Sequence, residues 1–561
     1  MVASLERRHF DALYEAQSKY EPGKLGERAT KDFILRHVFG IAPELIKQPS
    51  DLLRMLLRRH YRRQTLPRTL DERLIQVLRQ SGQFDQWPLE EIVPDREAFF
   101  SFLQDRWPTF LEHMIDRIKS GKWEVREEQE SKRYASYTTH VLPFDHDDVR
   151  VYIDNLFIEG LLKPVSHPQG EILADTWAAV GVLISSDEYQ QKRIERLLDQ
   201  VEDRIPNLSS SHRDWLDFAP LWAELLASIY GSEEIQGKSA FSDPLEELIT
   251  RVDSAFVEWV MKRFNSLMNL PPAPPVMLHH IPRYLARHVQ EWPIAFLLID
   301  GLSLDQWVSV KGELQKLSPD LTFHQDQVFA WIPTITSVSR QAVFSGSEPF
   351  YFPASINTTA KEESLWMRFW TDQNQGLSPR NVAYLKGVDE EGMNRIAELL
   401  DNPGLRVVGL VIDKVDKIMH GMELGAAGMH NQVKQWVKGG FLANLVSLLL
   451  EKGFRVFISS DHGNIEAVGM GGPKEGSIAD IKGERVRVYP DPALRAQVKK
   501  KFPNSLEWPP VGLPEGFYPL IAKSRNAFIS KGRRTVAHGG ITVEEVIVPF
   551  VEVKRKPNEF S

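Results

Sequence analysis

In the first 270 residues, apolar side chains recur three and four positions apart, which is the spacing of an amphipathic helix. The segments DFILRHVFGIAPELI and PSDLLRMLLRRHYRRQ both have this spacing. We therefore predict a helical N-terminal domain over residues 1–118 and a mostly helical middle domain over residues 119–270. In the middle domain, FDHDDVRVYIDNLFIEGLLKPVS is typical of a helix and turn that lead into a strand, so part of this domain is predicted to be winged-helix-like.

The pattern changes after PPAPP, residues 271–275, which is a stiff polyproline-like spacer. Short, continuous apolar runs now alternate with longer helical patterns. Such runs are typical of strands in a mostly parallel sheet that is buried on both faces. The sequence therefore predicts an α/β domain over residues 280–561, with a mostly parallel sheet between layers of helices. The predicted strands are IAFLLID, QVFAWIP, VVGLVID, RVFISSD and VIVPFVEV.

Composition limits the chemistry more than it limits the partners. The 561 residues include no cysteine, which excludes disulfides, thiolate metal sites and a cysteine nucleophile. The N-terminus lacks the apolar segment of a signal peptide and no run is long enough to span a membrane, so we expect a cytoplasmic protein. A net charge of -8 gives no overall attraction to nucleic acid. The basic run at residues 58–63 is either a solvated or salt-bridged helix face, which we favour, or a phosphate contact.

Three of the five predicted strands end on an aspartate: Asp300, Asp413 and Asp461. Ligands of open α/β sheets bind outside the carboxyl ends of the strands, so these carboxylates are expected to converge. Each one alone also has an ordinary explanation as a helix N-cap or turn residue. Gly301 allows the backbone to turn sharply after Asp300, which leaves that carboxylate free to bind a cation.

Two further positions supply a hydroxyl and an imidazole. Thr336 precedes a helical pattern, and a hydroxyl at a helix N-terminus lies among unpaired N–H groups that suit an anionic phosphoryl group. It is a candidate nucleophile, although an ordinary N-cap is the alternative. Asp416 and His420 are four residues apart, so on a helix both face one side and can reach one metal ion. Asp413 competes with Asp416 for this role.

The stretch FISSDHGN ends a predicted strand on Asp461 and His462. Adjacent side chains on an extended strand point apart, so both bind one ion only if the backbone has begun to turn, which we expect at Gly463; otherwise they serve different ligands. His538 precedes two glycines before the last strand and is a further candidate. These nitrogen and oxygen donors suit two divalent cations, zinc or manganese, as in phosphoryl-transfer sites.

The motifs LLIDGLS, IPTITSVSR, DKIMH, SSDHGN and AHGGITVEEVIVP occur in this order. Together they resemble the alkaline phosphatase superfamily, and within it the PglZ domain of bacteriophage-exclusion (BREX) systems, over roughly residues 290–553. The ending HGG-x-x-x-EE-VIVP is the feature that most favours PglZ. The resemblance implies an alkaline-phosphatase-like α/β fold preceded by a largely helical N-terminal half.

The resemblance also implies a role for each candidate residue. One metal ion would be bound by Asp300, Thr336, Asp461 and His462, with Thr336 as the nucleophile, and the other by Asp416, His420 and His538. Phosphodiesterases of the superfamily carry an aromatic residue, a proline and an asparagine after the threonine. This chain has Ser337, Val338 and Ser339 instead, so an amide that holds the phosphoryl group is missing, and Arg340 is a candidate to replace it.

The expected function is that of a metal-dependent phosphatase, phosphodiesterase or nuclease with a role in antiviral defence. The expected partners are other phage-defence proteins and, as a second candidate, nucleic acid, with no membrane association. The alternative is a mainly structural subunit of a phage-defence complex with weak or no catalysis, which the large helical half favours.

Overall fold

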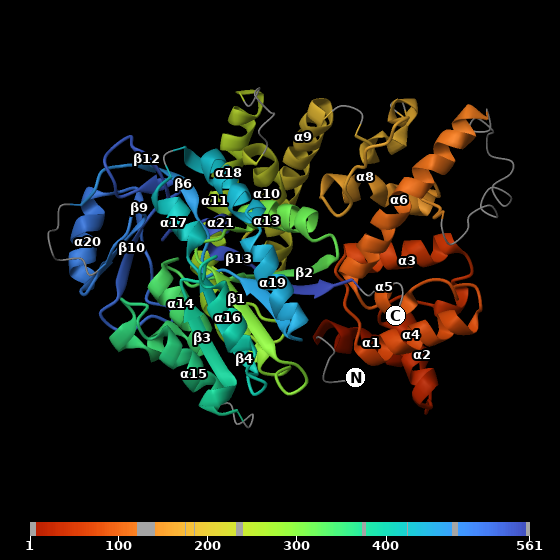
Figure 1. Ribbon diagram of the computed structural model, residues 1–561, viewed down its shortest axis with the longest axis horizontal. Coiled ribbons are helices and arrows are strands. Elements are labelled where there is room, and N and C mark those ends of the chain that lie inside the picture. The colour runs from red at the N-terminus through yellow and green to blue at the C-terminus, as the bar shows by residue number, and fades with distance from the viewer. Residues whose placement is uncertain are drawn as a thin grey trace. The chain divides into compact units, whose positions relative to one another are not determined.

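We analysed a computed structural model of the chain (Figure 1). It describes residues 7–120, 141–173, 176–183, 186–231, 239–372, 377–422, 424–473 and 481–556. The chain divides into two compact units, Met1–Arg193 and Ile194–Ser561. This is a division by compactness, and the three-domain organisation expected from the sequence stays a prediction.

The described part of the first unit is mostly helical and has its own apolar core. In α3 and α4, Leu52, Leu56, Leu70 and Leu74 recur at the predicted spacing of four residues and are all buried. Asp95 caps the longest of these helices, because its carboxylate accepts hydrogen bonds from two N–H groups of the first turn. The helices are α1 (Arg7–Tyr20), α2 (Glu27–His37), α3 (Pro49–Tyr61), α4 (Arg68–Gln80), α5 (Leu89–Ile92), α6 (Arg96–Lys119) and α8 (Asp147–Ile158).

At least three residues of the basic run at residues 58–63 form contacts inside this unit. The buried Arg59 guanidinium lies 2.7 Å from the Asp71 carboxylate. The His60 Nε2 atom lies 2.9 Å from the Ile92 carbonyl oxygen, and the Tyr61 hydroxyl donates to Glu159. Arg59, His60 and Tyr61 therefore stabilise the fold, while phosphate contact by the other members of the run stays a prediction.

The segment predicted to be winged-helix-like contains one clear helix. It is α8 (Asp147–Ile158), which begins after His146, whose side chain accepts from the Asp148 N–H. The predicted strand after it is reduced to an isolated bridge in which Val165 pairs with Val182. The segment thus has the predicted helix but, in its described residues, no extended strand.

The second unit contains long helices in addition to the α/β domain. They are α10 (His212–Tyr230), α11 (Ser239–Leu267) and the larger part of α9 (Ser186–Arg204), which begins before the boundary between the units. The Trp259 ring of α11 stacks on the ring of Phe329, with centroids 5.8 Å apart, and its Nε1 donates to the Ser210 carbonyl oxygen. Because Phe329 ends a strand of the central sheet, this contact packs α11 against the α/β domain.

The central sheet has six strands in the order β2-β13-β5-β1-β4-β3, and β13 alone runs antiparallel to its neighbours. The apolar runs of β1 and β4 are completely buried, as expected for central strands covered on both faces. All five predicted strands belong to this sheet. The strands are β1 (Ile294–Ile299), β2 (Leu321–Phe329), β3 (Val382–Lys386), β4 (Val407–Ile412), β5 (Arg455–Ser459) and β13 (Ile547–Arg555).

Helices cover both faces of this sheet (Figure 1). Phe296 of β1 packs with Phe344 of α14 and Trp366 of α15. Because alternate side chains of a strand point to opposite faces, Leu297 faces the other layer, where α13 and α19 lie against β13 and β5. The helices of this part are α12 (His280–Leu285), α13 (Leu304–Leu317), α14 (Thr336–Ser345), α15 (Glu362–Asp372), α16 (Met393–Leu400), α17 (Lys414–His420), α18 (Gly425–Lys438), α19 (Phe441–Glu451), α20 (Pro492–Lys501) and α21 (Val543–Val546).

Two small sheets lie between β5 and β13 in the chain and were not predicted. One has the order β7-β8-β10-β9 and the other β11-β6-β12. The second of them ends just before His538 and so helps to position this residue. The strands are β6 (Ile465–Gly469), β7 (Ile481–Lys482), β8 (Val486–Tyr489), β9 (Ser505–Glu507), β10 (Tyr518–Ala522), β11 (Asn526–Ala527) and β12 (Arg534–Ala537).

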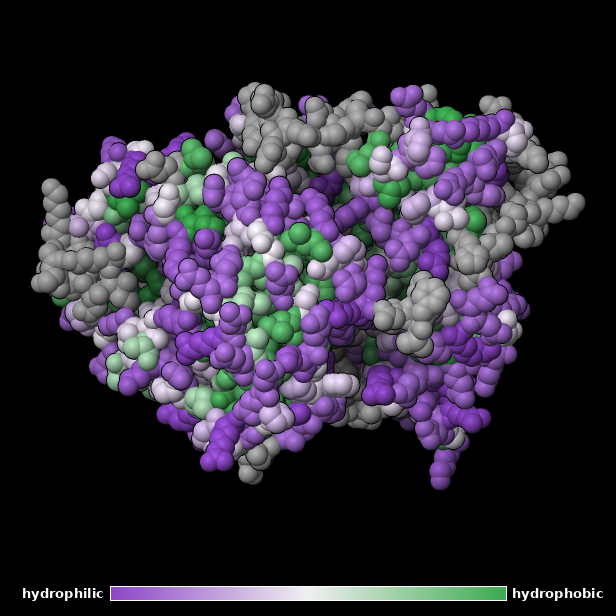
Figure 2. Space-filling model, in the orientation of Figure 1, coloured by the Kyte–Doolittle hydropathy of each residue, from purple (hydrophilic) through white to green (hydrophobic). Residues whose placement is uncertain are grey.

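The face displayed in Figure 2 is mainly hydrophilic, with hydrophobic residues in small groups. This distribution agrees with apolar cores that lie inside each unit. Among the described helices, none combines the length and the apolar character that a membrane crossing requires.

Candidate metal centre

The first group of candidate ligands lies beyond the ends of β1 and β5. Ligand atoms of Asp300, Asp461 and His462 all lie within 4.8 Å of one another, and the three residues are buried. The His462 Nε2 atom is 3.4 Å from Asp461 Oδ2 and 3.9 Å from Asp300 Oδ1. These two oxygen atoms accept no hydrogen bond from the described residues. Two carboxylate oxygens that lack a described protein donor therefore converge with one imidazole nitrogen, which is an arrangement that suits a cation.

The other oxygen of each carboxylate is held by the protein. Asp461 Oδ1 accepts a hydrogen bond of 3.1 Å from the Gly301 N–H, and Asp300 Oδ2 accepts one of 2.7 Å from Arg340. Gly301 has a φ of +75°, so the predicted sharp turn after Asp300 is confirmed. Each carboxylate is thus oriented so that its other oxygen faces His462 Nε2.

Thr336 joins this group through its hydroxyl. Its Oγ1 atom lies 3.0 Å from His462 Nε2, and His462 Nδ1 lies 3.1 Å from the Gly463 carbonyl oxygen. A carbonyl oxygen can only accept, so Nδ1 carries the proton and Nε2 accepts from the threonine hydroxyl. The N-cap of α14 is Ile335, without a side-chain hydrogen bond, so Thr336 is the first residue of the helix and its hydroxyl is not an ordinary cap.

Burial sets the protonation of this group in the absence of an ion. It raises the pKa of Asp461 well above its usual value, with the neighbouring Asp300 carboxylate as the next cause. Burial also raises the pKa of Asp300 to about 6, although Arg340 opposes the shift. For His462, burial and then His538 lower the pKa well below its usual value, so the imidazole is neutral. Arg340 is a counter-charge for these carboxylates, but it is shared with Glu362. A neutral imidazole beside two such carboxylates is a donor set that a divalent cation would stabilise.

The second group consists of Asp416, His420 and His538, whose ligand atoms also lie within 4.8 Å of one another. Asp416 and His420 are both on α17 and face one side of it, with His420 Nε2 3.4 Å from Asp416 Oδ1. His538 Nδ1 donates to the Thr334 carbonyl oxygen at 2.8 Å, which leaves Nε2 as the free ligand atom. This group is more exposed than the first, because more than half of the His420 side chain is accessible to solvent.

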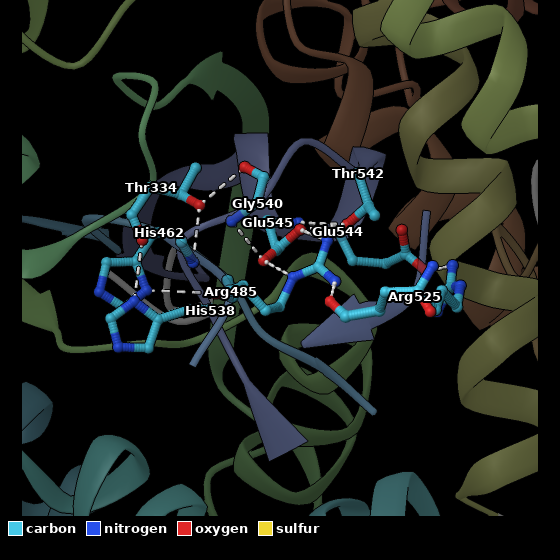
Figure 3. Close-up of polar contacts among 12 residues, drawn as sticks. Thr334, His462, Arg485, Arg525, His538, Gly540, Thr542, Glu544 and Glu545 are labelled. Carbon is cyan, nitrogen blue, oxygen red and sulfur yellow. Dashed lines mark hydrogen bonds and ion pairs between the residues drawn. The ribbon is translucent and has the colours of Figure 1, made fainter. Parts of the chain in front are cut away.

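The two groups are neighbours. The rings of His462 and His538 are stacked, with centroids 4.0 Å apart and planes 6° apart. Figure 3 shows this pair of rings beside Thr334. The structure therefore brings all seven predicted site residues together in two adjacent groups and Thr336, while their function as metal ligands and nucleophile stays a prediction.

Asp413 lies outside both groups. It occupies the N-cap position of α17, and its Oδ2 atom is 3.6 Å from Lys417 Nζ. Of the two competing aspartates, Asp416 is the one whose carboxylate lies with the histidines. Asp413 is therefore the residue at the start of a helix, which is the ordinary explanation given for each of these aspartates in the sequence analysis.

The suggestion that Arg340 replaces the missing phosphoryl-binding amide is wrong in its geometry. The Arg340 guanidinium is 2% exposed and binds two carboxylates, Asp300 Oδ2 at 2.7 Å and Glu362 Oε2 at 2.5 Å. Tyr384 also donates to Glu362 Oε2, at 2.6 Å. Arg340 therefore orients Asp300. Neither Glu362 nor Tyr384 belongs to a motif, and the sequence offered no signal for them.

A second buried ion pair supports the loop that carries His538 (Figure 3). The side chains of Arg485 and Glu545 have no exposed surface, and Arg485 Nε lies 2.8 Å from Glu545 Oε1. The same carboxylate accepts from the Gly540 N–H at 2.8 Å. The Thr334 hydroxyl donates to the Gly540 carbonyl oxygen and accepts from the Gly539 N–H. The HGG-x-x-x-EE pattern thus has a physical basis, because the carboxylate of its second glutamate, Glu545, accepts a hydrogen bond from its second glycine, Gly540.

The backbone turn expected at Gly463 lies two residues earlier. The chain bends at Asp461, two residues after the last residue of β5, and Gly463 is not in the left-handed region. A Cβ atom at Gly463 would lie 1.9 Å from the Glu544 carbonyl oxygen. Glycine is required here because the backbone of the short helix α21 approaches closely. The bend at Asp461 lets Asp461 and His462 point into the same group.

A mostly parallel sheet between helical layers, with carboxylates and imidazoles beyond the ends of its strands, defines this part of the chain as an alkaline-phosphatase-like α/β domain. Residues 285–553 match the family model described as the BREX system PglZ alkaline phosphatase-like domain. This part of the chain is therefore a PglZ domain.

Comparison with solved structures found partial similarities. Murine ectonucleotide pyrophosphatase/phosphodiesterase 5 has 13% sequence identity and a TM-score of 0.37, over 46% of this chain and 87% of that chain. Phosphonoacetate hydrolase from Sinorhizobium meliloti 1021, in complex with phosphonoformate, has 12% identity and a TM-score of 0.32, over 48% of this chain and 92% of that chain. No curated protein matches this chain.

Proposed function

We propose that this PglZ domain hydrolyses phosphoric esters, as a phosphatase, phosphodiesterase or nuclease, with Thr336 as its nucleophile. The observation that carries the proposal is the Thr336 hydroxyl, which lies 3.0 Å from His462 Nε2 beside the first group of candidate ligands. Thr336 is also the first residue of α14, so the unpaired N–H groups of the first turn adjoin the nucleophile. Such a helix N-terminus stabilises the anionic phosphoryl group.

Two divalent cations, zinc or manganese, fit the donors of the two groups. Asp300, Thr336, Asp461 and His462 would hold one cation, and Asp416, His420 and His538 the other. The fit rests on buried carboxylate oxygens of Asp300, Asp416 and Asp461 that no described donor satisfies. When bound, the cations would lower the pKa of the threonine hydroxyl and neutralise charge on the phosphoryl oxygens.

The chain's own residues would perform the following steps. Thr336 Oγ1 forms a bond to phosphorus in line with the ester oxygen, and the bond from phosphorus to that oxygen breaks as the alcohol leaves. Water then hydrolyses the phosphothreonine and restores the hydroxyl. Throughout, Arg340 and the Gly301 N–H hold the carboxylates of Asp300 and Asp461 in place.

Activity of matched variants tests this proposal. The purified full chain is incubated with zinc or manganese and with an aryl phosphate monoester, an aryl phosphodiester or plasmid DNA. We expect Thr336→Ala to lower turnover by a factor on the order of 10³ or more and Thr336→Ser to retain part of it, because serine keeps the nucleophilic hydroxyl. The control Ser337→Ala removes the neighbouring hydroxyl and is expected to remain near the wild-type rate. Equal rates of Thr336→Ala and the wild type would contradict the role of Thr336.

We also propose that the domain acts in antiphage defence together with other defence proteins, as the PglZ match suggests. The alternative is a mainly structural subunit, and phage protection in cells that carry Thr336→Ala distinguishes it from catalysis. If Thr336→Ala assembles normally and phage protection is lost, chemistry is needed. If protection persists, the structural function is favoured.

A further inference from the structure

A second concave site lies at the opposite end of α14 from Thr336. It has a volume of about 690 Å³ and is lined by α12 and the turn after it, the end of α14 and the last turns of α15. The helix has ten residues, so with a rise of about 1.5 Å per residue its two ends are roughly 15 Å apart. This hollow is therefore separate from the candidate metal centre.

The charge of the hollow is strongly positive. Arg283, Arg287 and Arg368 line it, and Asp372 is the one acidic residue of the lining, which gives a formal charge of +2. None of these arginines forms an ion pair with a described residue. The chain as a whole has a net charge of -8, so the charge of this site is opposite in sign to that of the protein. A concave surface lined by one sign of charge concentrates counter-ions of the other sign.

One of the guanidinium groups is already oriented. Arg283 Nε donates to the Gly346 carbonyl oxygen at 2.8 Å, which leaves both terminal nitrogens available. Gly346 ends α14 with a φ of +61°, and a Cβ atom there would lie 2.5 Å from the Phe369 ring. The glycine therefore fixes the carbonyl that holds Arg283. A planar guanidinium held at Nε presents the fork of donors that binds two phosphate oxygens.

We propose that Arg283, Arg287 and Arg368 form an anion site that binds the phosphate groups of a polyphosphate or nucleic-acid ligand. A ligand with several phosphate oxygens can bind three guanidinium groups that, among the described residues, have no ion-pair partner. A single carboxylate would leave most of these donors without a partner. The site goes beyond the proposed hydrolysis and does not depend on the nucleophile.

Binding is measured on the full chain with Thr336→Ala as the parent and EDTA in the buffer, so that neither turnover nor bound metal contributes. The probes are pyrophosphate, followed by calorimetry, and a fluorescein-labelled 20-nucleotide single-stranded DNA, followed by anisotropy. The test variant is R287A/R368A. The control is R263A/R395A, which removes two exposed arginines of the same unit that lie outside the hollow.

We expect R287A/R368A to raise the Kd of at least one probe about ten-fold or more, while the control stays within about two-fold. For DNA, the slope of log Kd against log salt should fall by about 1.4, or about 0.7 for each lost phosphate contact. Loss of DNA binding alone identifies a nucleic-acid backbone as the ligand, and loss of pyrophosphate binding alone identifies a small polyphosphate. The proposal is overturned if the parent binds neither probe, if R287A/R368A binds both as the parent does, or if the control weakens binding equally.

Because Thr336→Ala is the parent, failure of this binding test leaves the hydrolysis proposal intact. If the wild-type chain hydrolysed none of the substrates while the parent still bound a probe at this site, the hydrolysis proposal alone would be contradicted. The melting temperatures of both double variants are also measured, to check that each variant is folded. All four arginines are exposed, so both variants are expected to melt with the parent.

Discussion

The ion pair between Arg485 and Glu545 should be the strongest single link between the small sheets and the loop of His538. Glu545 Oε1 accepts from Arg485 Nε and from the Gly540 N–H, each at 2.8 Å. Glu545 Oε2 accepts from Arg485 Nη2 and from the Thr542 hydroxyl, each at 3.1 Å. Glu545→Gln preserves the volume of the side chain, but it removes the charge and turns one acceptor into a donor.

The structure sets the size of the expected loss. Both side chains are fully buried, so Glu545→Gln leaves the Arg485 charge in the interior without a counter-charge. Removing one partner of a buried pair costs roughly 3–5 kcal/mol. For a unit as large as residues 194–561, this corresponds to a fall in melting temperature of roughly 4 to 6 °C.

Scanning calorimetry of the full chain measures this fall. The control is Asp401→Asn, which removes an exposed ion pair with Lys452 and should cost less than about 1 kcal/mol. If the melting temperature after Glu545→Gln fell no further than after Asp401→Asn, the buried pair would not anchor this part of the domain. The reasoning from burial would then be refuted.

Three further outcomes follow from other contacts. Gly463→Ala places a Cβ atom 1.9 Å from the Glu544 carbonyl oxygen, so it should cost roughly 1–3 kcal/mol, measured as a lower melting temperature. Burial raises the pKa of Asp253 to about 6, so the folded state favours its protonated form and stability is lost as the pH rises from about 4 to about 6. Asp253→Asn removes this loss, and its melting temperature relative to wild type should rise between about pH 4 and about pH 7; a constant difference would contradict the shift. EDTA should lower the melting temperature of the metal-loaded chain, because the Asp300 and Asp461 carboxylates lose the charge of the bound cation. Asp461→Asn should reduce bound metal from about two equivalents to about one, measured by elemental analysis. A wild-type chain that binds no metal would refute both expectations.

The central strands could be predicted because a strand that is buried on both faces has apolar residues at consecutive positions. β1 and β4 end one residue before the predicted ends, and the aspartates follow. β2 begins at Leu321, six residues before the predicted run, because it is an edge strand whose first part alternates between buried and partly exposed positions. β3, at the other edge, has one buried residue, Val382, and so carries no apolar run. Edge strands were therefore predicted in part or missed.

The site residues could be found because they follow strand ends and because the motifs occur in a recognisable order. The residues that hold them could not be found in this way. Glu362 lies on α15 and binds Arg340, which in turn holds Asp300. Arg485 binds Glu545, which in turn holds Gly540 in the loop of His538. Each is a charged residue whose burial depends on tertiary packing, and a sequence pattern does not distinguish a buried charge from a solvated one.

The position of Arg340 changes the meaning of the altered sequence after Thr336. Arg340 lies four residues beyond Thr336 on α14, and its guanidinium holds Asp300 Oδ2 while Asp300 Oδ1 faces His462. The side chain suggested for the phosphoryl group is thus used to orient a ligand of the proposed metal. With Ser337 and Ser339 in place of the family's residues, the phosphoryl group would be held mainly by the cations and by the N–H groups at the start of α14. The altered sequence therefore weakens the case for tight substrate binding by side chains, and it leaves the case for metal-dependent chemistry at Thr336 unchanged.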